Sequence, residues 1–417
     1  MSLTPKTFPV LRAFSLFPVS PAICVLAAGV GAAMHIGKLP PALPVLGQVL
    51  GVTLLQAGFL LSSMQLAGML LGLLTGLAVQ RTGARRSIVL GLLTMAAGSA
   101  LGAMADSTAW LLATRAIEGM GFLWVVLPAP GLLRQLVSAD RVNRVMGFWG
   151  SYMPLGTSLA LLAGPYVMHL LLPDAGWRLW WCVLSVWCVL LALLIVWRVP
   201  AGSGVVTASG SSLKLLHLTL RSRPAWLLAV SFAVYSGQWL AVVGFLPTIY
   251  ALAGVPITLA GWLTALAAAS NMTGNIAAGR LLEKGVRPLT LMLTGFVVMA
   301  AGALLTFAVG IDPRLQFAAV LLFSGVGGLI PATLFSLSVR LAPSPATVST
   351  TVGWMQQWSA IGQFSVPPLV AWVAVQASGW QLTGGVCLAC CVVGMLLARS
   401  IHLEMLLRAN TKALTKA

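Results

Sequence analysis

Residues 76–86 read Gly76-Leu-Ala-Val-Gln80-Arg81-Thr-Gly83-Ala-Arg85-Arg86 and separate two long apolar runs. The two glycines permit a tight turn and a close approach of the backbone. The three arginines are too costly to place inside a lipid bilayer, so they stay at its surface. This stretch therefore predicts a short charged loop that joins two membrane-spanning helices.

The composition of the whole chain agrees with a membrane protein. Hydrophobic residues make up 59% of the 417 residues and charged residues only 7%, and the mean hydropathy is +0.98. Soluble globular domains carry roughly 25% charged residues, so soluble enzyme folds are excluded. The apolar stretches are long and do not alternate with polar residues, which argues against a membrane β-barrel.

An apolar run of about 20 residues crosses a bilayer as a helix, and charged residues, glycines and prolines divide the chain into twelve such runs. We therefore predict an all-α membrane protein with twelve transmembrane helices. The predicted helices cover residues 19–46, 52–79, 87–105, 109–133, 145–172, 177–197, 225–252, 258–282, 288–309, 314–339, 349–375 and 380–400.

The basic residues predict the orientation in the membrane, because cytoplasmic loops carry an excess of Lys and Arg. With the N-terminus inside, 20 of the 24 Lys and Arg lie on the cytoplasmic side. We therefore expect a multi-pass protein of the bacterial inner membrane with both termini in the cytoplasm. The net charge of +17 is then a signal of topology. Since no basic run is interleaved with aromatic residues, we expect no nucleic-acid partner.

The longest polar stretch divides the chain into two halves. We predict a six-helix half over residues 1–197, a cytoplasmic linker over 198–224, a second six-helix half over 225–400 and a cytoplasmic tail over 401–417. A weak repeat supports this division, because Gly279 is followed by Glu283, Lys284, Gly285 and Arg287 about half the chain length after Gly76. Two parallel halves around a site near the midplane are typical of transporters.

The loop at 76–86 resembles the signature of the major facilitator superfamily, which is a Gly followed by Asp-Arg-x-Gly-Arg and a further Arg or Lys. Two more stretches are similar to family patterns: Arg115-Ala-Ile-Glu118-Gly119-Met-Gly121, and the Pro-rich helix end Gly37-Lys38-Leu-Pro40-Pro41-Ala-Leu-Pro44. The resemblance implies a secondary transporter that works by alternating access. The subgroup that it suggests contains cyanate and nitroimidazole transporters.

The resemblance also implies a gating role for the loop. In the family, the acid of this motif pairs with a cation and holds the two halves together when the cytoplasmic side is closed. Gln80 replaces that acid here and cannot form an ion pair, so a weaker latch is expected. The gating residues predicted on this basis are Gly76, Gln80, Arg81, Gly83, Arg85 and Arg86. The alternative is that the arginines only set the topology.

Arg115 and Glu118 are two charged residues within one predicted membrane helix. A spacing of three places them on one helix face, and a charge inside a membrane is functional by default. Burial favours the protonated form of Glu118, whereas the neighbouring Arg115 favours the ionised form. We predict that Glu118 couples transport to protons and that Arg115 contributes to the substrate site. The alternative is a static structural ion pair.

His35 and Lys38 have the same spacing near the end of the first predicted helix. In the family this region lines the central cavity, so Lys38 is predicted to hold an anionic cargo and His35 to donate a hydrogen bond or a proton. If Glu118 is protonated or pairs with Arg115, Lys38 is left without a partner. The alternative is that Lys38 reaches the outer membrane surface.

The second half offers neutral candidates for the substrate site. Amides would fix the orientation of the cargo and aromatic rings would bury its apolar part, although each amide could equally form a bond between helices. The predicted residues are Tyr235, Gln238, Trp239, Asn271, Gln356, Gln357 and Trp358.

Together these features predict a secondary active transporter that moves a small organic solute, expected to be a monoanion, with proton coupling. The alternative is efflux of a drug or metabolite by proton antiport. We expect no enzyme activity, no cofactor and no metal, because clustered catalytic side chains and nucleotide-binding loops are missing from the sequence. The expected partners are the substrate, protons and the lipid bilayer, with the chain acting as a monomer.

Overall fold

The computed structural model describes residues 20–138, 141–170, 175–201 and 212–414. The side chains of some residues within these ranges, including 76–81, 142–144 and 409–414, lie outside the description. The described residues form helices and no strand. The prediction of an all-α protein is therefore confirmed.

The helices up to residue 198 begin at the first apolar run. They are α1 (Pro21–Gly37), the 3₁₀ turn η2 (Pro40–Ala42), α2 (Leu43–Leu50), α3 (Leu54–Ser63), α4 (Leu66–Thr82), α5 (Ala84–Ala103), α6 (Thr108–Val126), α7 (Ala129–Leu136), α8 (Val142–Gly150), α9 (Tyr152–Met168) and α10 (Gly176–Arg198).

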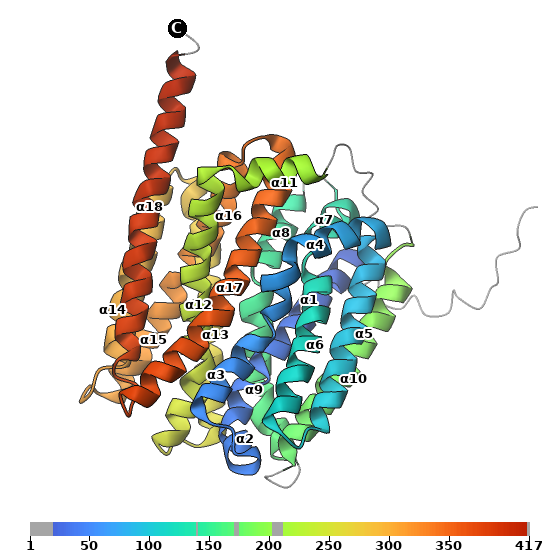
Figure 1. Ribbon diagram of the computed structural model, residues 1–417, viewed down its shortest axis with the longest axis vertical. Helices are drawn as coiled ribbons and strands as arrows, with labels where there is room; N and C mark the ends of the chain where they lie inside the picture. The colour runs from blue at the N-terminus through green and yellow to red at the C-terminus, as the bar shows by residue number, and fades with distance from the viewer. Residues whose placement is uncertain (1–19, 139–140, 171–174, 202–211, 415–417) are drawn as a thin grey trace, which may run out of the picture.

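The later helices follow a short helix, α11 (Ser212–Leu220), which lies within the predicted linker. They are α12 (Arg223–Leu252), α13 (Ile257–Glu283), α14 (Pro288–Thr306), α15 (Pro313–Gly327), α16 (Leu329–Leu341), the 3₁₀ turn η4 (Pro345–Thr347), α17 (Val348–Gln376) and α18 (Thr383–Leu414). Figure 1 shows the long helices running roughly side by side, with α5, α6 and α10 at one edge and α14 and α18 at the other.

Within the described residues, nine helical segments are long and apolar enough to cross a membrane, and the bent pair α3–α4 brings the number to ten. α9 has only 17 residues, and α13 carries the polar residues Asn271 and Asn275 near its middle. The protein is thus a helical membrane protein with many spans.

Several predicted helices are interrupted, each for a local reason. The predicted first helix ends at Gly37 because Pro40 and Pro41 supply no backbone N–H. The predicted continuous helix over 52–79 is wrong, since α3 and α4 meet at an angle of 45°. At this break Ser62 and Ser63 donate to the carbonyls of Phe59 and Leu60 at 3.1 Å, and such bonds compete with the helix ladder and bend it.

Glycines bring the backbones of α5 and α6 into direct contact. A Cβ at Gly91 would lie 2.6 Å from the carbonyl oxygen of Gly121, and a Cβ at Gly98 would lie 2.9 Å from Cγ of Glu118. Small residues are used in this way where helices must approach closely in lipid. As a result, Ser99 on α5 and Glu118 on α6 reach the same buried region.

Candidate functional site

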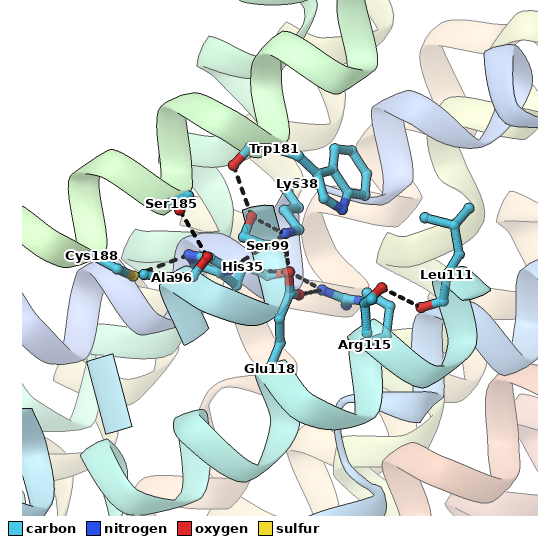
Figure 2. A network of polar contacts seen from close by, with 11 residues as sticks. His35, Lys38, Ala96, Ser99, Leu111, Arg115, Glu118, Trp181, Ser185 and Cys188 are labelled. Atoms are coloured by element: carbon cyan, nitrogen blue, oxygen red, sulfur yellow. Dashed lines mark hydrogen bonds and ion pairs between the residues drawn. The ribbon is translucent and has the colours of Figure 1, made fainter. Parts of the chain in front are cut away.

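Four predicted residues meet in one place in the interior of the protein. His35 lies on α1, and Lys38 is the residue directly after the end of that helix. Arg115 and Glu118 lie on α6. Each of the four is 0% exposed. Figure 2 shows their side chains pointing toward one another between these helices. We call these four residues the ion cluster.

The carboxylate of Glu118 is shared between two cations. Its Oε1 accepts a bond from Lys38 Nζ, and its Oε2 accepts a bond of 2.7 Å from Arg115 Nη1. Nδ1 of His35 lies 3.7 Å from the same Oε1. Lys38 therefore has a partner, and the expectation that pairing with Arg115 leaves it without one is wrong. One carboxylate is enough for both cations because each of them binds a different oxygen.

Residues of α5 and α10 surround Lys38 and His35. Nζ of Lys38 donates to Ser99 Oγ at 2.8 Å and lies 4.6 Å from the ring centroid of Trp181. Ser99 in turn donates to the carbonyl of Trp181 at 2.8 Å. Nε2 of His35 lies 3.2 Å from Cys188 Sγ. Because Lys38 Nζ faces Nδ1 at 3.4 Å, Nδ1 of a neutral imidazole accepts and Nε2 carries the proton.

Sequence reasoning missed Ser99, Trp181 and Cys188. Ser99 follows Gly98, and Gly98 and Gly102 are the signals in the sequence that other helices approach there. Trp181 contributes a backbone carbonyl and a ring face, which no residue pattern marks.

The ion cluster carries more positive than negative groups. Lys38 and Arg115 stand against one carboxylate, and the contacts of His35 fit a neutral ring. Within the described part of the chain, Nε and Nη2 of Arg115 are buried without a hydrogen-bond partner, while Nη1 also donates to the carbonyl of His35 at 2.7 Å. Buried donors without partners are costly. The arrangement can therefore stabilise an added acceptor, above all an anion.

A second group of predicted residues meets on α12, α13 and α15. Nδ2 of Asn271 donates to the hydroxyl of Tyr235 and to the carbonyl of Ser324, both at 2.8 Å. Nε1 of Trp239 donates to Ser324 Oγ at 3.0 Å. Tyr235, Trp239 and Asn271 thus form one neutral polar group around Ser324, which the sequence analysis did not select. We call it the neutral cluster.

The other predicted residues of the second half lie apart from the neutral cluster. Gln238 faces α18, where Cys391 donates to its Oε1 at 3.4 Å. Gln357 of α17 donates to the carbonyl of Met69 on α4 at 2.8 Å. The ring of Trp358 packs 5.4 Å from that of Trp226, and Gln356 is half-buried on α17. The structure therefore does not bring all seven candidates together.

The loop between α4 and α5 turns at Gly83. Its φ of +80° is a conformation that favours glycine. Arg85 reaches α10 and donates to the carbonyl of Val196 at 2.5 Å, and Arg86 is exposed. The side chains of Gln80 and Arg81, and the surroundings of Gly76, lie outside the described residues. The gating role of this loop stays a prediction.

The cysteines do not form a metal site. All six lie in the described part of the chain and are free. Among the described residues, no three His, Cys, Asp or Glu are arranged to hold a metal ion. Cys387 and Cys391 are buried among apolar side chains, as small hydrophobic residues usually are.

Comparison with known proteins identifies the family. A sequence profile described as Major Facilitator Superfamily matches residues 22–366. The chain is 30% identical to the chloramphenicol resistance protein of Streptomyces lividans over 80% of this chain and 88% of that protein. It is 25% identical to the cyanate transport protein CynX of Escherichia coli K12 over 76% of this chain and 80% of that protein.

Solved structures show the same fold. A bacterial homologue of the human lysosomal transporter Spinster, in an inward-facing and occupied conformation, superposes with a TM-score of 0.74 at 14% identity. The alignment covers 92% of this chain and 95% of that one. The family profile spans most of the chain, and the predicted likeness to the cyanate transporter subgroup is confirmed. This chain therefore belongs to the Major Facilitator Superfamily, a family of membrane transporters.

Proposed function

We propose that this protein is a twelve-span secondary transporter that moves a small monoanion together with protons by alternating access. The observation that carries the proposal is the ion cluster, in which two fully buried cations share one carboxylate. Buried charges in membrane proteins mark substrate and ion pathways. The excess positive charge of the cluster favours an anionic cargo over a lipophilic cation.

Arg115 supplies the geometry for binding. Nε and Nη2 lie on one edge of the planar guanidinium, and both lack a partner within the described residues. Two parallel N–H donors match an acceptor with two oxygens, such as a carboxylate. The remaining nitrogen, Nη1, is held by Glu118 and by the carbonyl of His35. The guanidinium is thus positioned before the cargo arrives.

Glu118 couples the cargo to a proton by changing partners. When a monoanion binds Lys38, it competes with Glu118 for the same ammonium group. The released carboxylate then keeps Arg115 as its cationic partner in a buried environment, where burial favours its protonated form. A proton bound by Glu118 therefore accompanies the anion, and both leave when the pair with Lys38 forms again. His35 stands 3.7 Å from Glu118 Oε1 and can pass that proton.

The neutral cluster completes the proposed site from the second half. In this arrangement residues 1–197 and 225–400 are the two rocking halves, joined by residues 198–224, with residues 401–417 as the tail. α9 and α13 supply the two spans that bring the ten long apolar segments to twelve. Contacts between the halves support a hinge, since Ser158 donates to the carbonyl of Ala265 at 2.6 Å and Gln65 donates to Gln363 at 2.9 Å.

We also propose an inner-membrane location with both termini in the cytoplasm. Cysteines placed at Arg85, Arg144, Lys214 and Lys284 are expected to resist an impermeant maleimide added to intact cells, because basic loops stay inside. Arg314→Cys, on the opposite side, is the matched control and is expected to react. Labelling of any two of the four cytoplasmic positions in intact cells would overturn this orientation.

Uptake into proteoliposomes tests the function directly. With an alkaline interior, the purified protein is expected to accumulate radiolabelled small monoanions such as cyanate or short carboxylates. Collapse of the pH gradient by a protonophore is expected to reduce this to equilibration. Accumulation of a lipophilic cation in place of every anion tested would contradict the proposal.

The alternative is efflux by proton antiport, and the similarity to a chloramphenicol resistance protein favours it. Cells that express this chain would then tolerate more chloramphenicol than cells that express the Glu118→Gln variant. Equal tolerance, together with anion uptake by the proteoliposomes, supports the first function.

A further inference from the structure

The last helix, α18, is longer than a membrane span requires. Its 32 residues extend about 48 Å at 1.5 Å per residue, whereas the hydrocarbon core of a bilayer is about 30 Å thick. Sequence analysis predicted its end at residue 400, but the helix continues to Leu414. Figure 1 shows α18 at the edge of the protein, with its C-terminal part extending beyond the other helices.

One face of α18 carries mainly apolar residues at alternating intervals of three and four. We call this face the seam, and it consists of Val386, Ala389, Val393, Leu396, Ser400, Leu403 and Leu407. Asn410 and Leu414 continue the same spacing in the sequence. Every described member is exposed or half-buried, whereas Cys387, Cys391 and Ile401 on the opposite face are buried against the protein.

The outer part of the seam lies beyond the expected membrane surface. Arg399 marks that surface, because a charged side chain is expensive in the hydrocarbon. Leu396 before it is 57% exposed and can contact lipid. Leu403 and Leu407 follow it and are 60% and 59% exposed. Leu406, beside the seam, is 48% exposed. Apolar side chains spaced by three and four residues on a helix that leaves the membrane are the pattern of a coiled-coil seam.

We propose that the seam packs against the same seam of a second copy, so that the transporter is a dimer with a parallel pair of α18 helices. A spacing of 3.5 residues is the repeat of a left-handed coiled coil. In heptad terms, the a positions hold Val386, Val393, Ser400 and Leu407, and the d positions hold Ala389, Leu396 and Leu403. Valine at a beside leucine at d, as at Val393 and Leu396, favours two parallel strands.

Charge supports the parallel orientation. Arg399 falls at a g position and Glu404 at the e position five residues later, which is the offset of an ion pair between parallel partners. Oε1 of Glu404 is already bound by Arg223 at 3.0 Å, so the pair between copies would use the second oxygen. Two copies inserted in one membrane with the same orientation are necessarily parallel, and a two-fold axis along the membrane normal satisfies this.

A membrane surface fits the same helix less well as its partner. To lie on the bilayer, the outer part of α18 would have to bend sharply at Arg399. The helix is continuous through this point and contains no glycine or proline after Gly394. Sharp bends nearly always need such a residue. A second copy covers the seam without any bend, so the expectation of a monomer is replaced here by that of a dimer.

Cross-linking of the full-length protein in membranes tests the proposal. Cys182 and Cys390, which are not fully buried, are first replaced by serine. Leu403→Cys and Leu407→Cys are then expected to form disulfide-linked dimers under mild oxidation, because equivalent seam residues face each other across the axis. His402→Cys points away from the seam and is the matched control. No dimer at either seam position, or equal yield at residue 402, overturns the proposal.

Subunit counting gives an independent readout. Stepwise photobleaching of labelled protein in liposomes is expected to show two copies per particle for the native chain. The double variant Leu403→Glu and Leu407→Glu is expected to show one, with unchanged thermal unfolding because both side chains lie on the exposed face. A single copy for the native chain contradicts the dimer, and a helix bound to the membrane surface would then explain the seam. The proposed cargo and coupling do not depend on either result.

Discussion

Replacement of Glu118 by glutamine is expected to abolish accumulation of the cargo against its gradient while leaving part of the exchange activity. Glutamine keeps the size of the side chain, and its single oxygen can still accept from Lys38 or Arg115, but it cannot take up or release a proton. Without that step, the flux of the anion is no longer tied to the pH gradient. The measurement is uptake and counterflow by the same proteoliposomes, with and without an alkaline interior.

The same substitution leaves two buried cations without an anion. Loss of one partner of a buried ion pair typically costs about 3–5 kcal/mol, so the variant is expected to unfold at a lower temperature and to regain stability when an anionic cargo is added. Glu283→Gln, at the exposed end of α13, is the control and should change neither property. Wild-type accumulation by the Glu118 variant would remove this residue from the coupling step.

Replacement of Lys38 by alanine is expected to raise the apparent KM for the anion about 10- to 100-fold, with a smaller effect on the maximal rate. A charge-assisted hydrogen bond contributes about 1.5–3 kcal/mol, and each 1.4 kcal/mol corresponds to about tenfold in affinity. The variant still contains the neutral pair of Arg115 and Glu118, so folding is expected to persist. Concentration-dependent initial rates of uptake measure the effect.

Two further substitutions separate the charge of Lys38 from its shape. Lys38→Arg keeps the positive charge but changes the geometry, so partial recovery of the apparent KM is expected. Lys38→Met keeps the length of the side chain without the charge and should behave like alanine. Lys284→Ala, in a surface turn, serves as the matched control. Normal KM values for Lys38→Ala would exclude this residue from cargo binding and would strengthen the efflux alternative.

The sequence allowed the centre of the ion cluster to be predicted because its members are paired along single helices. Arg115 with Glu118, and His35 with Lys38, each have a spacing of three, which places both members on one helix face whatever the surrounding fold. That all four meet was not predictable from spacing, because it depends on the angle between α1 and α6. Ser99, Trp181 and Cys188 lie on α5 and α10 and depend on the same packing.

The interruptions of the helices show the same division between local and long-range information. The end of α1 before Pro40 follows from proline chemistry and could be read from the chain. The bend between α3 and α4 could not be read from the chain. The carbonyl of Met64, at the bend, fits against Gly119, which is far away in the sequence. A Cβ at Gly119 would lie 2.2 Å from that oxygen.

Of the neutral candidates, Tyr235 and Asn271 are joined only by the packing of α12 on α13. An amide in a membrane helix always needs a partner, but the sequence does not say whether that partner is cargo, another helix or its own turn. Gln357 and Gln238 illustrate this, because their partners lie on other helices, α4 and α18, rather than in the neutral cluster.

Because one carboxylate faces two cations, the empty ion cluster carries one net positive charge. A monoanion bound together with one proton on Glu118 leaves that charge unchanged. Every step that changes the side of the membrane to which the cluster opens therefore moves the same charge. The proposed cycle is then electroneutral, and the final concentration ratio of the cargo should not respond to membrane voltage. In Glu118→Gln the anion would cross with its charge uncompensated. An inside-negative voltage of 100 mV opposes this by about 2.3 kcal/mol, or roughly 50-fold in the final concentration ratio.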